Sequence, residues 1–144
     1  MPRWLPGLSG SGSQDAVETV DLGAFIARME PTIRAWSPGI AVEIYAPEPA
    51  WARCDPAAVS RACELLCRDV WRRKATEPHL WITALPRGDV VDVAFEDDGQ
   101  VLTAPEWVQL LATLDADDGW VVSGGSGNGA TAVVLTFPGG AAPG

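Results

Sequence analysis

Few residues of this chain have the types and spacing that acid–base, nucleophilic or metal chemistry needs. The chain has one histidine, His79, and no serine–histidine–aspartate set accompanies it, so acid–base catalysis has few routes. Carboxylates cluster at Asp97-Asp98 and again within 115–118, in segments that read as turns, where aspartate is common for conformational reasons. We therefore expect no catalytic residue and no metal site.

The three cysteines, Cys54, Cys63 and Cys67, are an odd number and do not form a disulfide framework. This favours a reducing compartment, and we expect a cytoplasmic protein. Cys63 and Cys67 lie four residues apart on a predicted helix, a spacing that could supply half of a metal site, but no second ligand pair is visible. Small buried thiols are the favoured interpretation.

Length, composition and charge exclude several classes of protein. The chain has 144 residues, of which 47% are apolar, so one folded domain is expected rather than wholesale disorder. The net charge of −9 disfavours a nucleic-acid partner, because binding to phosphates needs a basic surface. No apolar run has the length of a membrane span, and the first residues lack the sustained hydrophobic segment of a secretory signal.

Apolar periodicity and turn residues predict the elements that must position any site. Helical spacing predicts helices over 22–36, 56–74 and 105–114, and Asp21 and Asp55 can cap the first two. The predicted strands cover 41–46, 51–53, 79–85, 90–96, 120–122 and 131–137. This order predicts an α+β fold, a two-layer α/β sandwich in which about three helices pack on one face of a mixed, mostly antiparallel sheet.

The two ends of the chain are rich in Gly, Ser and Pro. Residues 1–18 are expected to form a flexible leader, and 139–144 a disordered tail. One domain over 19–138 is left between them.

From about Asp21 to Pro138, the motifs and their order resemble the ATP-binding domain of bacterial sensor histidine kinases, which has the Bergerat or GHKL fold. Residues 55–59 (DPAAV) are similar to the start of that family's nucleotide-contacting helix. Residues 91–99 (VDVAFEDDG) resemble the strand that delivers its Asp-x-Gly motif, and 119–138 resemble its closing hairpin.

The resemblance implies five candidate nucleotide-binding residues. Asp97 matches the aspartate that accepts a hydrogen bond from the adenine amino group, and Gly99 matches the glycine that follows it. Glu64 matches the first polar residue of the helix, and Arg68 stands where the family has an asparagine that helps to hold Mg²⁺. Thr131, on the last strand, completes the set.

Several positions depart from the family pattern. Arg68 is a permanent cation and cannot ligate Mg²⁺, and Asp69 stands where a small residue is preferred. No glycine lies between Gly99 and Gly119, so the long lid and the Gly-rich phosphate box are expected to be absent. We therefore expect no cofactor, with ATP and Mg²⁺ as the alternative.

Simpler structural roles explain the same residues. Glu64 and Arg68 have the i, i+4 spacing of a favourable surface ion pair, and Asp69 and Arg73 repeat it. This role is favoured over a ligand site. His79 is expected to be structural rather than a phosphoacceptor, and the leader is too short to build the helical hairpin that carries a kinase's phosphorylatable histidine.

The favoured function is a non-catalytic, pseudo-ATPase module of a two-component-type signalling system that acts through protein contacts. Its partner would be a response regulator or a histidine kinase, which would bind the exposed surface of the helix at 56–73. A residual adenine-nucleotide-binding domain or kinase fragment is an alternative, and a phosphotransferase-related domain is another. Whether the chain is an enzyme stays open but leans toward no; an enzyme would be of the ATP-dependent kinase type.

Overall fold

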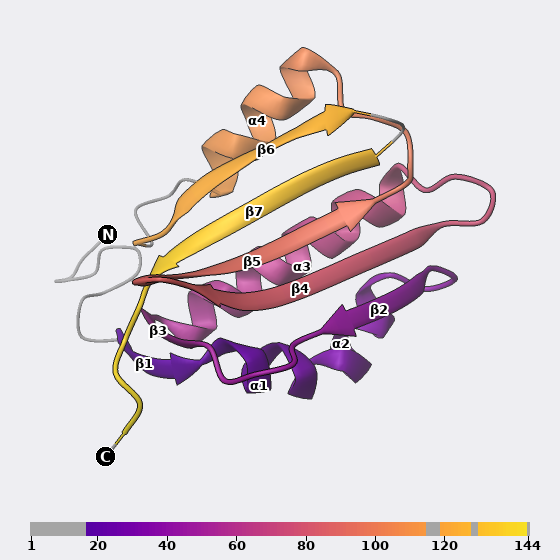
Figure 1. Ribbon diagram of the computed structural model, residues 1–144. Helices are drawn as coiled ribbons and strands as arrows, with labels where there is room; N and C mark the ends of the chain where they lie inside the picture. Colours follow the sequence, from indigo (N-terminus) through magenta and orange to yellow (C-terminus); the bar gives the residue numbers. More distant parts are fainter. Residues whose placement is uncertain (1–16, 115–118, 128–129, 144) are drawn as a thin grey trace, which may run out of the picture.

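The computed structural model describes residues 17–114, 119–127 and 130–143. The predicted leader lies outside this part of the chain, apart from its last two residues. The elements in chain order are β1 (Glu18–Asp21), α1 (Leu22–Arg28), α2 (Glu30–Trp36), β2 (Ala41–Tyr45), β3 (Trp51–Cys54), α3 (Pro56–Arg72), β4 (His79–Arg87), β5 (Val90–Asp97), α4 (Ala104–Leu114), β6 (Val121–Gly127) and β7 (Ala130–Pro138) (Figure 1).

Five strands form one sheet in the order β2-β4-β5-β7-β6. β2 runs parallel to β4, and every other neighbouring pair is antiparallel. β1 and β3 form a separate antiparallel pair. The predicted mixed, mostly antiparallel sheet is therefore confirmed.

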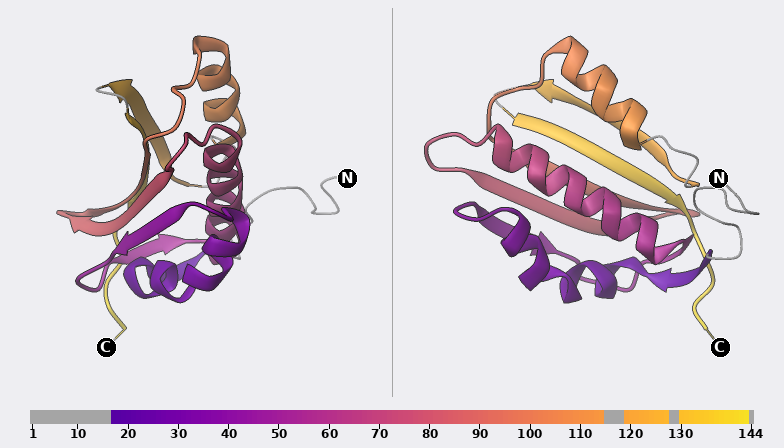
Figure 2. Two further views of the ribbon diagram at one scale, coloured as in Figure 1. Left: turned by 90° about the vertical axis from the view of Figure 1, so that its right-hand side faces the viewer. Right: turned by 180° about the vertical axis from the view of Figure 1, so that it is seen from behind.

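The helices cover one face of this sheet, and the core lies between the two layers (Figure 2). Along β5, alternate residues Val91, Val93 and Phe95 point into the core, as the strand period predicts. The buried stripe of α3 faces them and consists of Ala58, Val59, Ala62, Cys63, Leu66, Cys67 and Val70. α3 begins as predicted: the Asp55 side chain accepts a hydrogen bond from the Ala57 amide at 3.0 Å, and Pro56 occupies the first turn.

The predicted helix over 22–36 is wrong in one respect, because the structure divides it into α1 and α2 at Met29. Pro31 explains the break. A proline has no amide hydrogen to donate, and its ring clashes with the carbonyl four residues earlier, so it is tolerated only in a first helical turn. The described residues accordingly contain four helices where about three were expected.

Residues at both ends of the predicted domain belong to the folded body. β1 includes Glu18, which the sequence analysis placed in the leader, and pairs with β3. Gly139 and Gly140 were placed in the disordered tail, yet their amides donate to the carbonyls of Asp89 at 2.8 Å and Trp51 at 2.9 Å. Four-residue strands and single backbone contacts leave no periodic pattern that a sequence could reveal.

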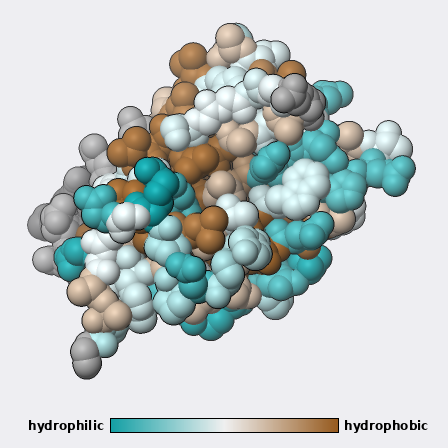
Figure 3. All heavy atoms as spheres, viewed as in Figure 1, coloured by the Kyte–Doolittle hydropathy of each residue, from teal (hydrophilic) through white to brown (hydrophobic). Residues whose placement is uncertain are grey.

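The face of the sheet opposite the helices is open, and apolar side chains are mixed with polar ones on it (Figure 3). Tyr45 and Val121 on the two edge strands are 59% and 66% exposed. No helix among the described residues combines the length and the apolar character that a membrane span needs.

Candidate functional site

Three of the five candidate residues meet at one end of the sheet. Asp97 ends β5 and lies opposite Thr131 of β7 in the strand register. The Gly99 amide donates to Asp97 Oδ1 at 2.9 Å. Thr131 is fully buried, and its hydroxyl lies 3.1 Å from that of Ser126. The strand pairing therefore places Asp97, Gly99 and Thr131 in one neighbourhood, as the resemblance requires.

The carboxylate of Asp97 is bound by an arginine of the same chain. Arg73, which caps the C-terminus of α3, donates from Nη1 to Asp97 Oδ1 at 3.2 Å and from Nη2 to Oδ2 at 2.9 Å. The Asp97 side chain is 2% exposed and that of Arg73 is 4% exposed. In this conformation neither oxygen of Asp97 is accessible to an adenine amino group.

Arg73 has further partners that hold it in this position. Its Nε donates to Asp69 Oδ2 at 2.9 Å, and Nη1 also donates to the backbone carbonyl of Gln100. Burial lowers the pKa of Arg73, but hydrogen bonds and charge from Asp97 and Asp69 outweigh this and raise it. The arginine therefore stays charged between two carboxylates. The sequence predicted its pairing with Asp69 but offered no sign of Asp97.

Gly99 has a packing role beside the end of α3. A Cβ atom at Gly99 would lie 2.6 Å from the backbone oxygen of Arg73. The Gln100 amide donates to that same oxygen at 2.9 Å. A glycine is thus required here by the close approach of two backbone segments, and this requirement is independent of any nucleotide.

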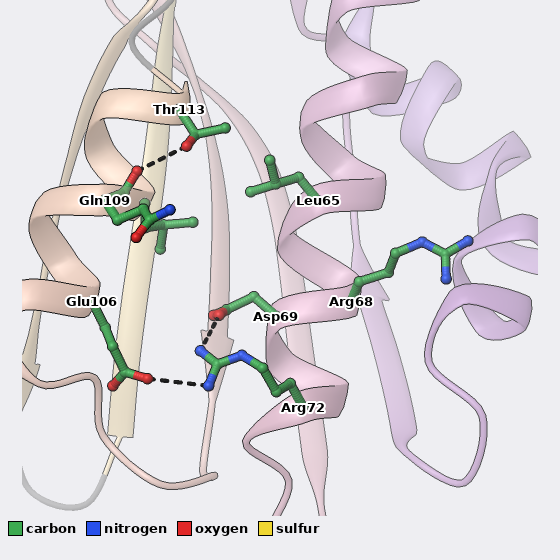
Figure 4. Close-up of a pocket in the computed structure, with 8 residues that line it drawn as sticks. Leu65, Arg68, Asp69, Arg72, Glu106, Gln109 and Thr113 are labelled. Atoms are coloured by element: carbon green, nitrogen blue, oxygen red, sulfur yellow. Dashed lines mark hydrogen bonds and ion pairs between the residues drawn. The ribbon is translucent and has the colours of Figure 1, made fainter.

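Leu65, Asp69 and Arg72 lie on the side of α3 turned toward α4 (Figure 4). Arg68 also lines the cleft, although its guanidinium points away from α4. Arg68 instead donates to Glu64 at 2.8 Å in the exposed i, i+4 pair that the sequence predicted. Arg68 is among the residues that line the cleft and Glu64 is not, and the contact of either residue with a nucleotide stays a prediction. Leu65 and Asp69 have the same spacing and face the cleft, because a one-residue step rotates a helix by about 100°.

A cleft of about 450 Å³ lies between α3 and α4, and an arginine crosses it. Arg72 donates to Asp69 Oδ1 at 2.8 Å and to Glu106 of α4 at 3.1 Å. Its hydrogen bond to Asp69 raises the pKa of Arg72, which keeps the guanidinium charged. A side-chain cation thus stands between the two carboxylates that could otherwise have attracted a metal ion.

The N-terminus of α4 is capped by side chains of its own first turn. The Thr103 hydroxyl accepts from the Glu106 amide at 3.3 Å, and Glu106 Oε1 accepts from the Thr103 amide at 2.8 Å. This reciprocal capping box satisfies amides that a phosphate would need at a helix start. The Thr103 amide lowers the pKa of Glu106, so a negative charge persists where a triphosphate would bring more.

The residues present therefore do not fit Mg²⁺-ATP in this conformation. The candidate adenine acceptor is buried against Arg73, and Leu65 offers no polar atom at the first cleft position. Asp69 has a suitable ligand type for Mg²⁺, but each of its oxygens accepts a hydrogen bond from an arginine. In the described part of the chain, no three His, Cys, Asp or Glu side chains group as a metal site. The carboxylates within 115–118 lie outside the described residues.

His79 and Asp98 form a structural pair near the same end of the sheet. Asp98 accepts from the His79 backbone amide at 2.8 Å, and its other oxygen lies 2.9 Å from His79 Nδ1. Burial raises the pKa of Asp98, but hydrogen bonds from His79 outweigh it and lower the pKa overall. The imidazole also stacks on Trp81 at 5.4 Å between ring centroids. These contacts agree with a structural histidine and join the starting residue of β4 to the residue that follows β5.

The three cysteines are free, and their side chains are buried. Burial raises the pKa of Cys54 to about 11 and that of Cys67 to about 12, and it also raises the pKa of Cys63. Thiols that stay protonated are poor nucleophiles and poor metal ligands, so their environment agrees with the packing role inferred from the sequence.

No family model matches the chain, and no curated protein matches it in sequence. Solved structures do share its fold. The ATP-binding domain of PrrB from Mycobacterium tuberculosis superposes with a TM-score of 0.72 at 20% identity, covering 88% of this chain and 100% of that one. The mycobacterial sensor histidine kinase MprB gives a TM-score of 0.65 at 13% identity and covers 85% and 98% of the two chains.

The histidine kinase domain of the Escherichia coli osmosensor EnvZ gives a TM-score of 0.61 at 12% identity and covers 93% of this chain and 96% of that one. The fold expected from the resemblance is therefore confirmed. Identities of 20% and below establish the shared fold and leave the activity to be argued from this chain's own residues.

Proposed function

We propose that this chain, which has the fold of a histidine-kinase ATP-binding domain, is a non-catalytic signalling module that acts through protein contacts. The observation that carries the proposal is the buried pair of Arg73 and Asp97, in which the chain's own guanidinium occupies the carboxylate that the resemblance assigns to adenine. A bound nucleotide would first have to displace Arg73.

The α3–α4 cleft supports the same proposal. Arg72 links Asp69 to Glu106 across the place where a metal-bound phosphate would be needed. A nucleotide that displaced this guanidinium would leave the two carboxylate charges unbalanced. This raises the free energy of nucleotide binding above that of a cleft without such an ion pair. One of the structures with the same fold, MprB, is described as a sensor histidine kinase, which supports a role in two-component signalling. In this proposal the module works in the cytoplasm, with a response regulator or a histidine kinase as its partner.

Calorimetric titration with ATP and ADP, each with and without Mg²⁺, tests this proposal. The expected result is no heat of binding and no rise in the melting temperature at millimolar nucleotide, since a ligand stabilises the native state only when its concentration approaches Kd. The ATP-binding domain of PrrB, titrated in parallel, is the matched positive control. Binding by this chain that is lost in Asp97→Asn would refute the proposal.

A residual adenine-binding domain is the second candidate. Its supporting observation is that the strand register and the Gly99 amide bring Asp97, Gly99 and Thr131 together. In this alternative, Arg73 leaves Asp97 when a nucleotide enters. Arg73→Met would then strengthen ADP binding relative to the wild-type protein, whereas the pseudo-ATPase proposal expects neither protein to bind.

A further inference from the structure

A second groove lies on the far side of α3, between that helix and α2. It has a volume of about 510 Å³ and is lined by Ala35, Trp36, Pro38, Arg68, Trp71 and Arg72. Figure 4 shows Arg68 directed toward this side, away from α4. The α2–α3 groove thus lies on the opposite side of α3 from α4, although Arg68 and Arg72 line both the groove and the α3–α4 cleft.

Trp71 is both exposed and held in place. Its side chain is 42% exposed, although its indole Nε1 donates to the Pro38 carbonyl at 3.1 Å. Lys74 Nζ lies 3.8 Å from the centre of the Trp71 ring in a cation–π contact. A tryptophan already fixed in one orientation loses little entropy on binding, and tryptophan and arginine are frequent among the residues that dominate interface energies.

The groove is bordered by an excess of positive charge. Its lining residues include two arginines, Arg68 and Arg72, and no carboxylate, whereas the whole chain carries −9. The hydrogen bond from Arg68 to Glu64 uses only Nε, which leaves its two terminal nitrogens directed to solvent or a partner. Lys74 forms no ion pair within the described part of the chain.

We propose that the α2–α3 groove docks an acidic segment of a partner protein. Its carboxylates would pair with Arg68 and Lys74, and an apolar side chain between them would pack on Trp71. This inference names the partner chemistry for the proposed signalling role and rests on it. A few local cations complement a short acidic segment, whereas the phosphate backbone of nucleic acid needs a wider basic surface, which a chain with a net charge of −9 disfavours.

Selection from a random 12-residue peptide display library on the purified full chain tests the inference. We expect the selected peptides to be enriched in Asp and Glu around an aromatic or aliphatic residue. By fluorescence anisotropy, a selected peptide should bind the double variant Arg68→Gln/Lys74→Gln about tenfold more weakly, as loss of two charge contacts predicts. Trp71→Ala should weaken it as much, and Arg87→Gln, an exposed arginine on β4, should not.

Three outcomes would overturn the inference: selected peptides without acidic enrichment, equal binding to wild type and both groove variants, or a single-stranded DNA oligonucleotide that competes for the groove at physiological salt. Circular dichroism of each variant shows whether it is folded. The nucleotide titration above separates the two proposals. If the chain binds a nucleotide and also binds an acidic peptide through the groove, the pseudo-ATPase role alone is refuted. If the chain binds neither a nucleotide nor an acidic peptide, the docking site alone is refuted.

Discussion

Arg73 holds two carboxylates at once, Asp97 through both terminal nitrogens and Asp69 through Nε. Burying such a group costs desolvation energy that the ion pairs largely offset, so the intact cluster adds little net stability. Removing one member has a much larger effect, because the remaining charge is left buried without a partner. The cluster therefore constrains which conformation is native more than it raises overall stability.

Arg73→Met should lower the free energy of unfolding by about 3–5 kcal/mol, since it leaves the Asp97 carboxylate buried without its cation. Urea unfolding at neutral pH measures this. The double variant Arg73→Met/Asp97→Asn should lose less than the sum of the two single variants, because the neutral amide has no charge to balance. Arg87→Met, at an exposed pair with Asp92, is the control and should change stability little. If the loss of unfolding free energy in the double variant equals the sum of the two single losses, Arg73 and Asp97 are not energetically coupled.

α3 and α4 decide the character of the cleft through the faces they present. α3 buries one stripe against the sheet, places Leu65 and Asp69 in the α3–α4 cleft, and places Trp71 in the α2–α3 groove. Arg68 and Arg72 line both. α4 begins with the capping box of Thr103 and Glu106, so its first amides are satisfied within the chain. A helix start that caps itself has less to offer an anion than one built from a Gly-rich loop.

Thr103→Ala should destabilise the protein by about 1 kcal/mol, the usual cost of losing an N-cap side chain. Thermal unfolding provides the number, and faster hydrogen exchange of the first-turn amides of α4 would locate the effect. Thr113→Ala is a matched control on the same helix, because its hydroxyl only donates to the Gln109 carbonyl from an exposed position. Equal losses for the two variants would show that the capping box adds nothing.

In the molecule as a whole, the two layers enclose one core that also contains the thiols. Cys54 lies on β3, and Cys63 and Cys67 lie on the buried face of α3. The reactivity of all three thiols therefore depends on the integrity of this one core. Burial raises the pKa of each thiol above its ordinary value near 9. A raised thiol pKa stabilises the native state below the pKa of the unfolded chain, and this contribution is lost as the pH rises toward the native pKa.

The three thiols should react very slowly with a disulfide reagent at about pH 8 in the native protein and rapidly in denaturing guanidinium chloride, because little thiolate forms in the core. Absorbance of the released thiolate gives both rates. Stability measured by urea unfolding should also fall as the pH rises above about 9, where unfolded cysteines ionise and native ones do not. Rapid native labelling of any of the three would contradict the described core.

Short-range features of this protein follow from the sequence by itself. The periodic spacing of apolar residues predicted α3, α4 and most strands of the main sheet. The helix caps at Asp21 and Asp55 are also where the sequence indicated them. The ion pair of Glu64 with Arg68 also needed only helical spacing. These features depend on neighbours within about four residues, so local chemistry is sufficient to determine them.

Only the tertiary structure decided what became of the candidate nucleotide site. Arg73 and Asp97 are 24 positions apart, and Arg72 and Glu106 are 34 apart, so both pairs exist because α3, β5 and α4 pack together. The rotation of α3 that turns Asp69 toward α4 is likewise set by which stripe the core buries. A sequence shows which charges a helix carries, but the packing of that helix determines which charge each one meets.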